Sequence, residues 1–295
     1  ITGSDLYVGG FVGRFYGNLN VIITISDSVN SGNVIGRNNY IGGFVGHIYV
    51  NTNFIMSISD SINNGDVTGG QYIGGLVGEI NYNTDMTMTI SNSISHGIVN
   101  GNDYVGGLVG YIYSSQSNSI SFINTANNGS VSANNGMACG FVCVDPEYNY
   151  DVNTTIKNSI NRGSVNANTY GYGITNIITM ARNVVSMGDV TGKSGSYTFW
   201  DASTDVDLFF GLVGKCSDCS DDATLFQHNI STGFYEVVGT GEHVDDLLND
   251  ESVNQHFGMV WTNELELVDK LTLTINVNGL LNELFYVGTG TPLNQ

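Results

Sequence analysis

Apolar and polar positions repeat along this chain with a period of about 32 residues. Each period opens with a segment in which aromatic or aliphatic residues alternate with glycine, continues through a long polar stretch, and closes with a Ser-Asx-Ser-aliphatic segment ending in Gly-x-Val. Tyrosines that open a Gly-Gly segment stand 33, 32 and 32 residues apart: Tyr7, Tyr40, Tyr72 and Tyr104. A period of this length is typical of stacked coils, so the pattern predicts a solenoid.

The repeat weakens but remains legible up to residue 235. Later opening segments are Met137–Cys143, Tyr170–Ile174 and Leu208–Gly214. A glycine follows each closing segment, in the series Gly32, Gly65, Gly97, Gly129, Gly163, Gly188 and Gly233. Because both series shift together, the sequence predicts about seven coils over residues 1–235.

The closing segments predict columns of equivalent residues, since stacked strands lie about 4.8 Å apart. Two β-branched columns predict inward ladders of an all-β, parallel β-solenoid core. One column is Val29, Ile62, Ile94, Ala126, Ile160, Val185 and Ile230, and the other is Val34, Val67, Val99, Val131, Val165 and Val190. An Asx column between them predicts side chains that satisfy amides at a corner: Asp27, Asp60, Asn92, Asn124, Asn158 and Asn183.

The polar stretch of each period predicts a hairpin-like extension, because residues 79–90 alternate around an Asn-Thr-Asp turn. Beyond Tyr235 the period stops. Glu242–Asp250 is the best helix candidate, and Leu271–Val277 alternates as a strand does. Residues 236–295 are therefore interpreted as a C-terminal cap or as the start of a following β domain.

The Gly-Gly-[Leu/Phe]-Val-Gly element resembles the GLUG repeat of large bacterial and protist surface proteins. Gly74–Gly78 and Gly106–Gly110 match it best, and the resemblance covers about residues 7–235. The Val260-Trp261-Thr262 segment is similar to the ends of such arrays. The resemblance implies a parallel β-solenoid in extracellular adhesins, surface fibres or protease stalks, without catalytic residues. Because Ile1-Thr-Gly copies Val67-Thr-Gly, we expect a processed protein or a piece of a longer array.

Composition narrows the classes of partner. The formal net charge is −19, and 17 of the 27 acidic residues follow position 188. With two basic residues in its first hundred positions, the chain offers no phosphate-binding stripe, so nucleic acid is not an expected partner. No apolar run is long enough to span a bilayer, so this segment predicts no membrane insertion.

Four cysteines raise the question of disulfides. Cys139 and Cys143 replace glycines of an opening segment, and a straight strand would hold them roughly 13 Å apart, so they are expected to be small buried side chains without a mutual bond. Cys216 and Cys219 are interpreted as a local disulfide, a bridge across coils being the alternative. A zinc site from all four is a weaker alternative.

Three sequons, Asn128, Asn153 and Asn229, predict N-glycosylation if the source is eukaryotic. A hydroxyl column suggests ice binding as a minor alternative to a solvated sheet face: Thr24, Ser57, Thr89, Ser121 and Thr155. Ile123 and Lys157 interrupt the neighbouring serine column.

The sequence shows few candidate catalytic residues. Asp27 and Asp60 are expected to stack on each other, but asparagine occupies the same position in the later coils. The histidines fall at positions unrelated to the repeat, so no set of acids and bases converges as a catalytic site requires. A polysaccharide-active β-helix enzyme is therefore a minor alternative. The acidic stretch Asp218–Asp222 fits no standard calcium loop. We expect neither a cofactor nor a metal.

The sequence favours a non-enzymatic, extracellular structural rod of a cell-surface or filament protein. Tyrosines of the polar stretches are expected to form an exposed ridge, which predicts binding of glycans or of a neighbouring subunit: Tyr16, Tyr49, Tyr82 and Tyr113. The alternative to a scaffold is a glycan- or receptor-binding adhesin. Self-association and other surface proteins are the expected partners, and covering the protein's own core is the competing interpretation of the ridge.

Overall fold

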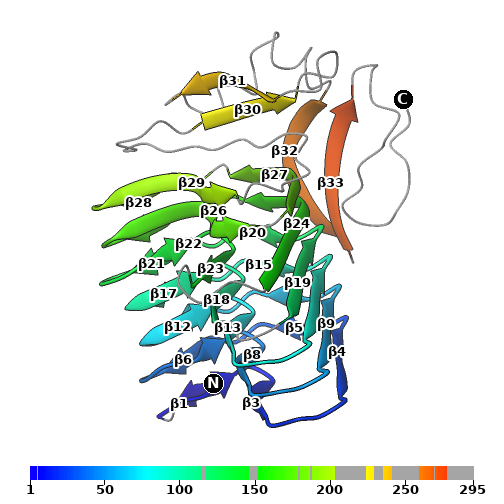
Figure 1. Ribbon diagram of the computed structural model, residues 1–295, viewed down its shortest axis with the longest axis vertical. Helices are drawn as coiled ribbons and strands as arrows, with labels where there is room; N and C mark the ends of the chain where they lie inside the picture. The colour runs from blue at the N-terminus through cyan, green and yellow to red at the C-terminus, as the bar shows by residue number, and fades with distance from the viewer. Residues whose placement is uncertain are drawn as a thin grey trace.

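The computed structural model describes residues 1–202 except 5, 114–116, 146–151, 179 and 187, together with four later strands. These residues form an all-β structure in which three parallel sheets run up a stack of coils, from the first coil to the green strands in Figure 1. The parallel β-solenoid expected from the repeat is confirmed. No helix occurs among the described residues.

The first sheet collects the Gly-x-Val strands. Its order is β1 (Thr2–Gly3), β6 (Val34–Gly36), β11 (Val67–Thr68), β16 (Val99–Gly101), β21 (Val131–Ala133), β25 (Val165–Ala167) and β28 (Val190–Gly192). Its valine column is fully buried, as predicted.

The second sheet collects the strands of the polar stretch and of the Ser-Asx-Ser segment. Its strands are β4 (Ile22–Ser26), β9 (Ile55–Ser59), β14 (Thr87–Ser91), β19 (Asn118–Ile123), β24 (Val152–Asn161), β20 (Ala126–Asn127), β15 (Ile94–Ser95), β10 (Ile62–Asn63) and β5 (Val29–Asn30), with β27 (Met180–Ser186) paired to β24.

The third sheet collects the glycine-rich opening segments and the strands that follow them. Its strands are β2 (Val8–Gly9), β7 (Ile41–Gly42), β12 (Gln71–Gly74), β17 (Asp103–Gly106), β22 (Ala138–Cys139), β26 (Tyr170–Ile178), β23 (Val142–Val144), β18 (Val109–Tyr113), β13 (Val77–Asn81), β8 (Val45–Tyr49) and β3 (Val12–Tyr16), with β29 (Gly195–Ala202) paired to β26.

The glycines of the opening segments let neighbouring coils approach closely. A Cβ placed on Gly75 would lie 2.1 Å from the carbonyl oxygen of Gly107 in the next coil. No side chain fits at that distance, so glycine is required there. The large apolar residues between these glycines fill the interior, where Phe44, Leu76 and Leu108 are fully buried.

The predicted inward column that begins at Val29 keeps its register along the stack. Its later members Ile94, Ala126 and Ile160 are at most 2% exposed, as expected of an inward ladder. Val29, in the first coil, is 52% exposed, so the expectation of a buried residue is wrong there.

The solenoid has about five turns, fewer than the seven expected. Val165 and Val190 are partners in adjacent strands, although only 25 residues separate them. The coil between them is thus shorter than the others, and β26 and β27 replace the separate short strands of earlier coils. The last expected copy drew its support from Leu208–Gly214 and Gly233, which lie outside the described residues.

The expected hairpin-like extensions are not formed in the described part of the solenoid. β13 and β14, on either side of the Asn-Thr-Asp turn, belong to different sheets and pair with equivalent strands of adjacent coils. The alternating residues on both sides of this turn do form strands, as predicted. In-register pairing between coils satisfies both strands, so the chain turns a corner there instead of folding back.

The corner residues adopt the left-handed conformation, with φ between 47° and 53° at Asp27, Asp60, Asn92 and Asn124. Asx residues tolerate this conformation better than others. Their side chains bond to each other between coils, as from Asn92 to Asp60 at 3.2 Å. The adjacent serines accept the corner amides instead, as Ser61 does from the amide of Ser28. The predicted capping by the Asx side chains is thus replaced by a hydroxyl ladder.

Beyond the solenoid, the described strands pair in an antiparallel manner. β30 (Thr224–His228) pairs with β31 (Tyr235–Thr240), and β32 (Met259–Val268) with β33 (Lys270–Val277), which confirms the strand expected at 271–277. The helix candidate 242–250 lies outside the described residues. The division into 1–235 and 236–295 and the capping role remain predictions.

Candidate functional site

The four tyrosines expected to form a ridge lie next to one another along the stack. We call this set the tyrosine ridge. Ring centroids are 5.8 Å apart for Tyr16 and Tyr49, 5.8 Å for Tyr49 and Tyr82, and 5.0 Å for Tyr82 and Tyr113. The first and third of these residues are 61% and 46% exposed. Binding to the ridge remains a prediction.

Tyr82 enters the ridge from an unexpected backbone position. In the strand ladder, Asn81 is the partner of Tyr49 and of Tyr113. Tyr82 follows the strand with a φ of 49°, and this left-handed turn accounts for its edge-on contact with Tyr49, at an interplanar angle of 81°. The ridge therefore changes its ring orientation in the middle.

The tyrosines that open the coils form a second column, which we call the inner stack: Tyr7, Tyr40, Tyr72 and Tyr104. Successive centroids are 5.2, 5.3 and 5.5 Å apart, and interplanar angles are 20° or less. These separations lie in the range of favourable aromatic pairs. The rings cover each other's faces and are half-buried.

A column of ionisable residues lies between the ridge and the inner stack. In strand register it reads Arg14, His47, Glu79 and Tyr111. Arg14 places its guanidinium 4.4 Å from the ring centroids of both Tyr7 and Tyr16. Such cation–π contacts stabilise the positive charge of the guanidinium against the ring faces, where a carboxylate would otherwise be needed.

His47 and Glu79 form an ion pair, with Nε2 and Oε2 2.8 Å apart and side-chain exposures of 3% and 2%. Neither of these two atoms has a hydrogen-bond partner in the described part of the chain. The contact is a salt bridge when the imidazole is protonated, and opposite charges attract strongly where water is excluded. His47 also stacks at 4.4 Å on Tyr40 and at 5.0 Å on Tyr49, so it connects the inner stack to the ridge.

The phenols near this column hold their protons strongly. Burial raises the pKa of Tyr72 to about 12, and the charge of Glu79 adds to the effect. Burial, followed by the same carboxylate, raises the pKa of Tyr40. The pKa of Tyr111 is raised by burial and by its hydrogen bond to Asp145. All three phenols are neutral at physiological pH.

Stacking limits what the rings can bind. Sugars pack on the faces of aromatic rings, yet in the inner stack these faces are covered by neighbouring rings. The inner stack therefore presents edges and hydroxyl groups to a ligand. In the ridge, the exposed and turned ring of Tyr82 and the terminal ring of Tyr16 are the best placed to accept one.

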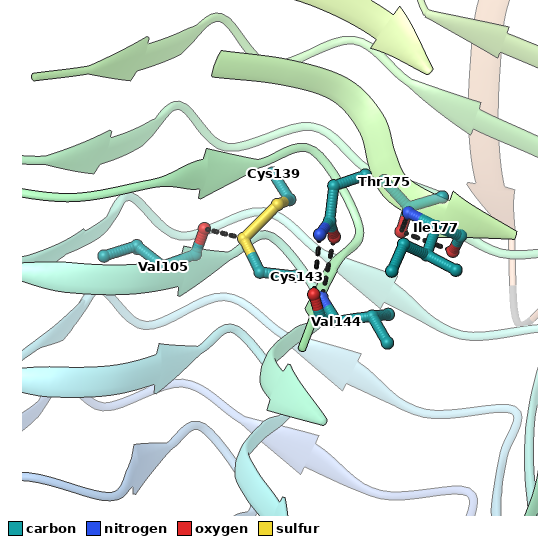
Figure 2. The surroundings of a disulfide bond; sticks show 7 residues. Val105, Cys139, Cys143, Val144, Thr175 and Ile177 are labelled. Carbon is teal, nitrogen blue, oxygen red and sulfur yellow. Dashed lines mark hydrogen bonds between the residues drawn. A yellow bond between two sulfur atoms is a disulfide. The ribbon is translucent and has the colours of Figure 1, made fainter. Parts of the chain in front are cut away.

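The cysteine expectation is wrong for Cys139 and Cys143, which form a disulfide with Cα atoms 5.5 Å apart (Figure 2). The straight-strand distance does not apply, because β22 ends at Cys139 and β23 begins at Val142, with a bend between them. The equivalent segment of an earlier coil is bent too, since a Cβ on Gly42 would lie 2.0 Å from the carbonyl oxygen of Val45. Both cysteines are fully buried, as expected, and the Cys143 sulfur lies 3.6 Å from the Val105 carbonyl oxygen. Cys216 and Cys219 lie outside the described residues.

The structure describes two of the three predicted glycosylation sites and the hydroxyl column. Asn153 is exposed, whereas the side-chain oxygen of Asn128 is buried and its nitrogen contacts His96, so Asn153 is the better placed glycan acceptor. Asn229 and the acidic stretch 218–222 lie outside the described residues. The hydroxyl column from Thr24 to Thr155 is in register on β4, β9, β14, β19 and β24, with Ile123 and Lys157 beside it.

Within the described part of the chain, no three His, Cys, Asp or Glu residues cluster as a metal site would require. Over the same residues, no helix is long and apolar enough to cross a membrane. Comparison with known proteins finds no matching family model, no matching curated protein and no matching solved structure. The resemblance to GLUG repeats therefore remains a proposal.

Sequence reasoning missed a buried asparagine ladder at one corner. Asn18 donates to the Asn51 side-chain oxygen at 2.8 Å, and Asn51 donates to the Asn83 side-chain oxygen at 2.9 Å through both its backbone amide and its side chain. Asn83 in turn donates to the Ile48 carbonyl oxygen at 3.0 Å. The signal was present, because these three asparagines stand 33 and 32 apart. The pairing of His47 with Glu79 had no such signal, because each type occurs once in its column.

Proposed function

We propose that this chain is a non-enzymatic structural module, a stiff rod of the GLUG-repeat type that belongs to an extracellular surface or filament protein. The observation that carries the proposal is the in-register repetition of buried polar ladders as well as apolar ones. Asn63 accepts a bond from Asn30 at 2.7 Å, and Asn127 donates to Asn161 at 2.8 Å, all within the interior.

Buried amide ladders favour a fixed register over a loose one. A slip between coils leaves each buried amide without its partner, at a cost of about 1–3 kcal/mol for each group. Because every coil contacts mainly its neighbours, the penalties add along the stack and resist bending as well as sliding. This is a property that a spacer or filament requires and that a catalytic cleft does not.

The test is electron microscopy of material purified from its native source, without refolding. Filaments or projections with a regular strand spacing of about 4.8 Å along their axis would support the structural role. Compact particles that turn over a polysaccharide would contradict it.

The ridge favours a second function, that of an adhesin. Tyr16 and Tyr82 expose ring surface, and a turned tyrosine can stack on a sugar. Glycan-array binding that is lost in Tyr82→Ala and retained in Tyr40→Phe would favour the adhesin. If the native protein binds no glycan on the array, the structural role is the one that stands.

A further inference from the structure

The tyrosine ridge and the inner stack form one connected set of rings. His47 joins the two columns through its contacts with Tyr40 and Tyr49, and Tyr111 lies 4.4 Å from Tyr104. Phenols held this close are reactive partners for one another once oxidised. The structural role proposed above makes no use of this chemistry.

Dityrosine formation is a balanced two-electron oxidation. Each of two phenols loses one electron and one proton to become a tyrosyl radical, and the two radicals join through the ring carbons beside the hydroxyl-bearing carbons. The hydrogens on these carbons shift to the oxygens and restore both phenols. Hydrogen peroxide, acting through a haem peroxidase, takes up the two electrons and two protons and becomes water.

We propose that Tyr82 and Tyr113 are an oxidative cross-linking pair that joins adjacent coils covalently. Their centroids are 5.0 Å apart, the shortest separation in the ridge, and their planes are tilted by 57°. The product joins two rings edge to edge with a twist between their planes, so a tilted pair needs little rearrangement. Tyr82 is 46% exposed, which gives the oxidant access to this pair.

The inner stack is a poorer substrate for the same chemistry. Tyr72 and Tyr104 face each other at 8°, so an edge-to-edge bond requires one ring to leave the stack. Burial also raises the pKa of Tyr72 to about 12, which opposes loss of its proton. Tyr104 and Tyr111 are closer, at 4.4 Å and 45°, but Tyr111 is only 5% exposed and its hydroxyl group is bonded to Asp145, so the oxidant has little access to that pair. We therefore expect the bond to form on the ridge.

The test oxidises the whole native chain with a haem peroxidase and a limiting amount of hydrogen peroxide. We expect dityrosine fluorescence in the monomer and a mass lower by two hydrogens. Digestion should give a linked peptide pair that contains positions 82 and 113. The yield should not depend on protein concentration, because both rings belong to one chain.

Matched variants make the result specific. Tyr82→Phe and Tyr113→Phe should each reduce intrachain dityrosine at least tenfold. Tyr170→Phe removes a tyrosine that is 40% exposed and has no ring contact among the described residues, and it should leave the yield unchanged. Cross-links that form only between molecules, or an intrachain yield that survives Tyr82→Phe, would overturn the proposal. A circular dichroism spectrum unchanged from the native one shows that each variant is folded.

Discussion

His47 and Glu79, in adjacent coils, bring Nε2 and Oε2 to 2.8 Å although both side chains are almost completely buried. Replacing Glu79 alone by Ala should therefore cost about 3–5 kcal/mol, because the histidine is left buried without its partner. Urea unfolding measures the loss. The double variant His47→Phe with Glu79→Leu should recover most of it, since apolar side chains of similar size can replace a buried pair. A double variant as unstable as the single one would contradict this account.

Two glycines at equivalent positions provide a matched test of coil stacking. A Cβ on Gly65 would lie 2.1 Å from the carbonyl oxygen of Gly32, so Gly65→Ala should cost about 1–3 kcal/mol or more. At Gly32, in the first coil, a Cβ would meet only the Asn30 side-chain oxygen at 4.0 Å. Gly32→Ala should change the free energy of unfolding by less than about 0.5 kcal/mol. Equal effects in thermal unfolding would show that the coils do not stack in this register.

Stability should fall at alkaline pH. The unfolded chain releases phenol protons near pH 10.0, whereas folded Tyr72 holds its proton up to about pH 12. Its contribution is fully present below pH 10 and is lost as pH rises toward 12, because ionisation then favours the unfolded state. Solvent screening reduces the effect, since the ring is only half-buried. Tyr72→Phe should make the urea midpoint less sensitive to pH in this window, and an unchanged slope would count against the buried phenol.

The disulfide predicts a particular pattern of thiol reactivity. Cys139 and Cys143 should resist alkylation in the native protein, and a non-reducing digest should show them linked. Because the bond closes a loop of only four residues, replacing both cysteines by alanine should cost about 2 kcal/mol in oxidised protein. Free thiols at these positions in protein isolated without reductant would contradict the pairing.

The repeat period was enough to predict the parallel stack and its valine column, because equivalent residues recur at almost constant spacing. Departures arose where the spacing or direction of the chain changes. The coil before Val190 is shorter than the others, which a constant period did not predict. A bend between β22 and β23 brings Cys139 close to Cys143, and an estimate that assumed a straight strand could not predict it.

The candidate site was predicted in part. The ridge followed from tyrosines that recur with the period, and Tyr82 joined it despite a backbone offset of one residue. The stacked ring faces and the buried Glu79 could not be foreseen, because side-chain orientation depends on which neighbour each coil supplies. Register has to be known before a column of unlike residues can be recognised.

Single-molecule stretching of the native chain tests the central claim that this is a mechanically stiff stack of coils. Coil-to-coil hydrogen bonds join residues 32 apart, so each coil that unfolds should release about 110 Å of chain at a maximum of about 3.5 Å per residue. We predict discrete steps in multiples of this length, each above a clear force threshold. Smooth extension without steps, or a single step for the whole solenoid at low force, would contradict the account.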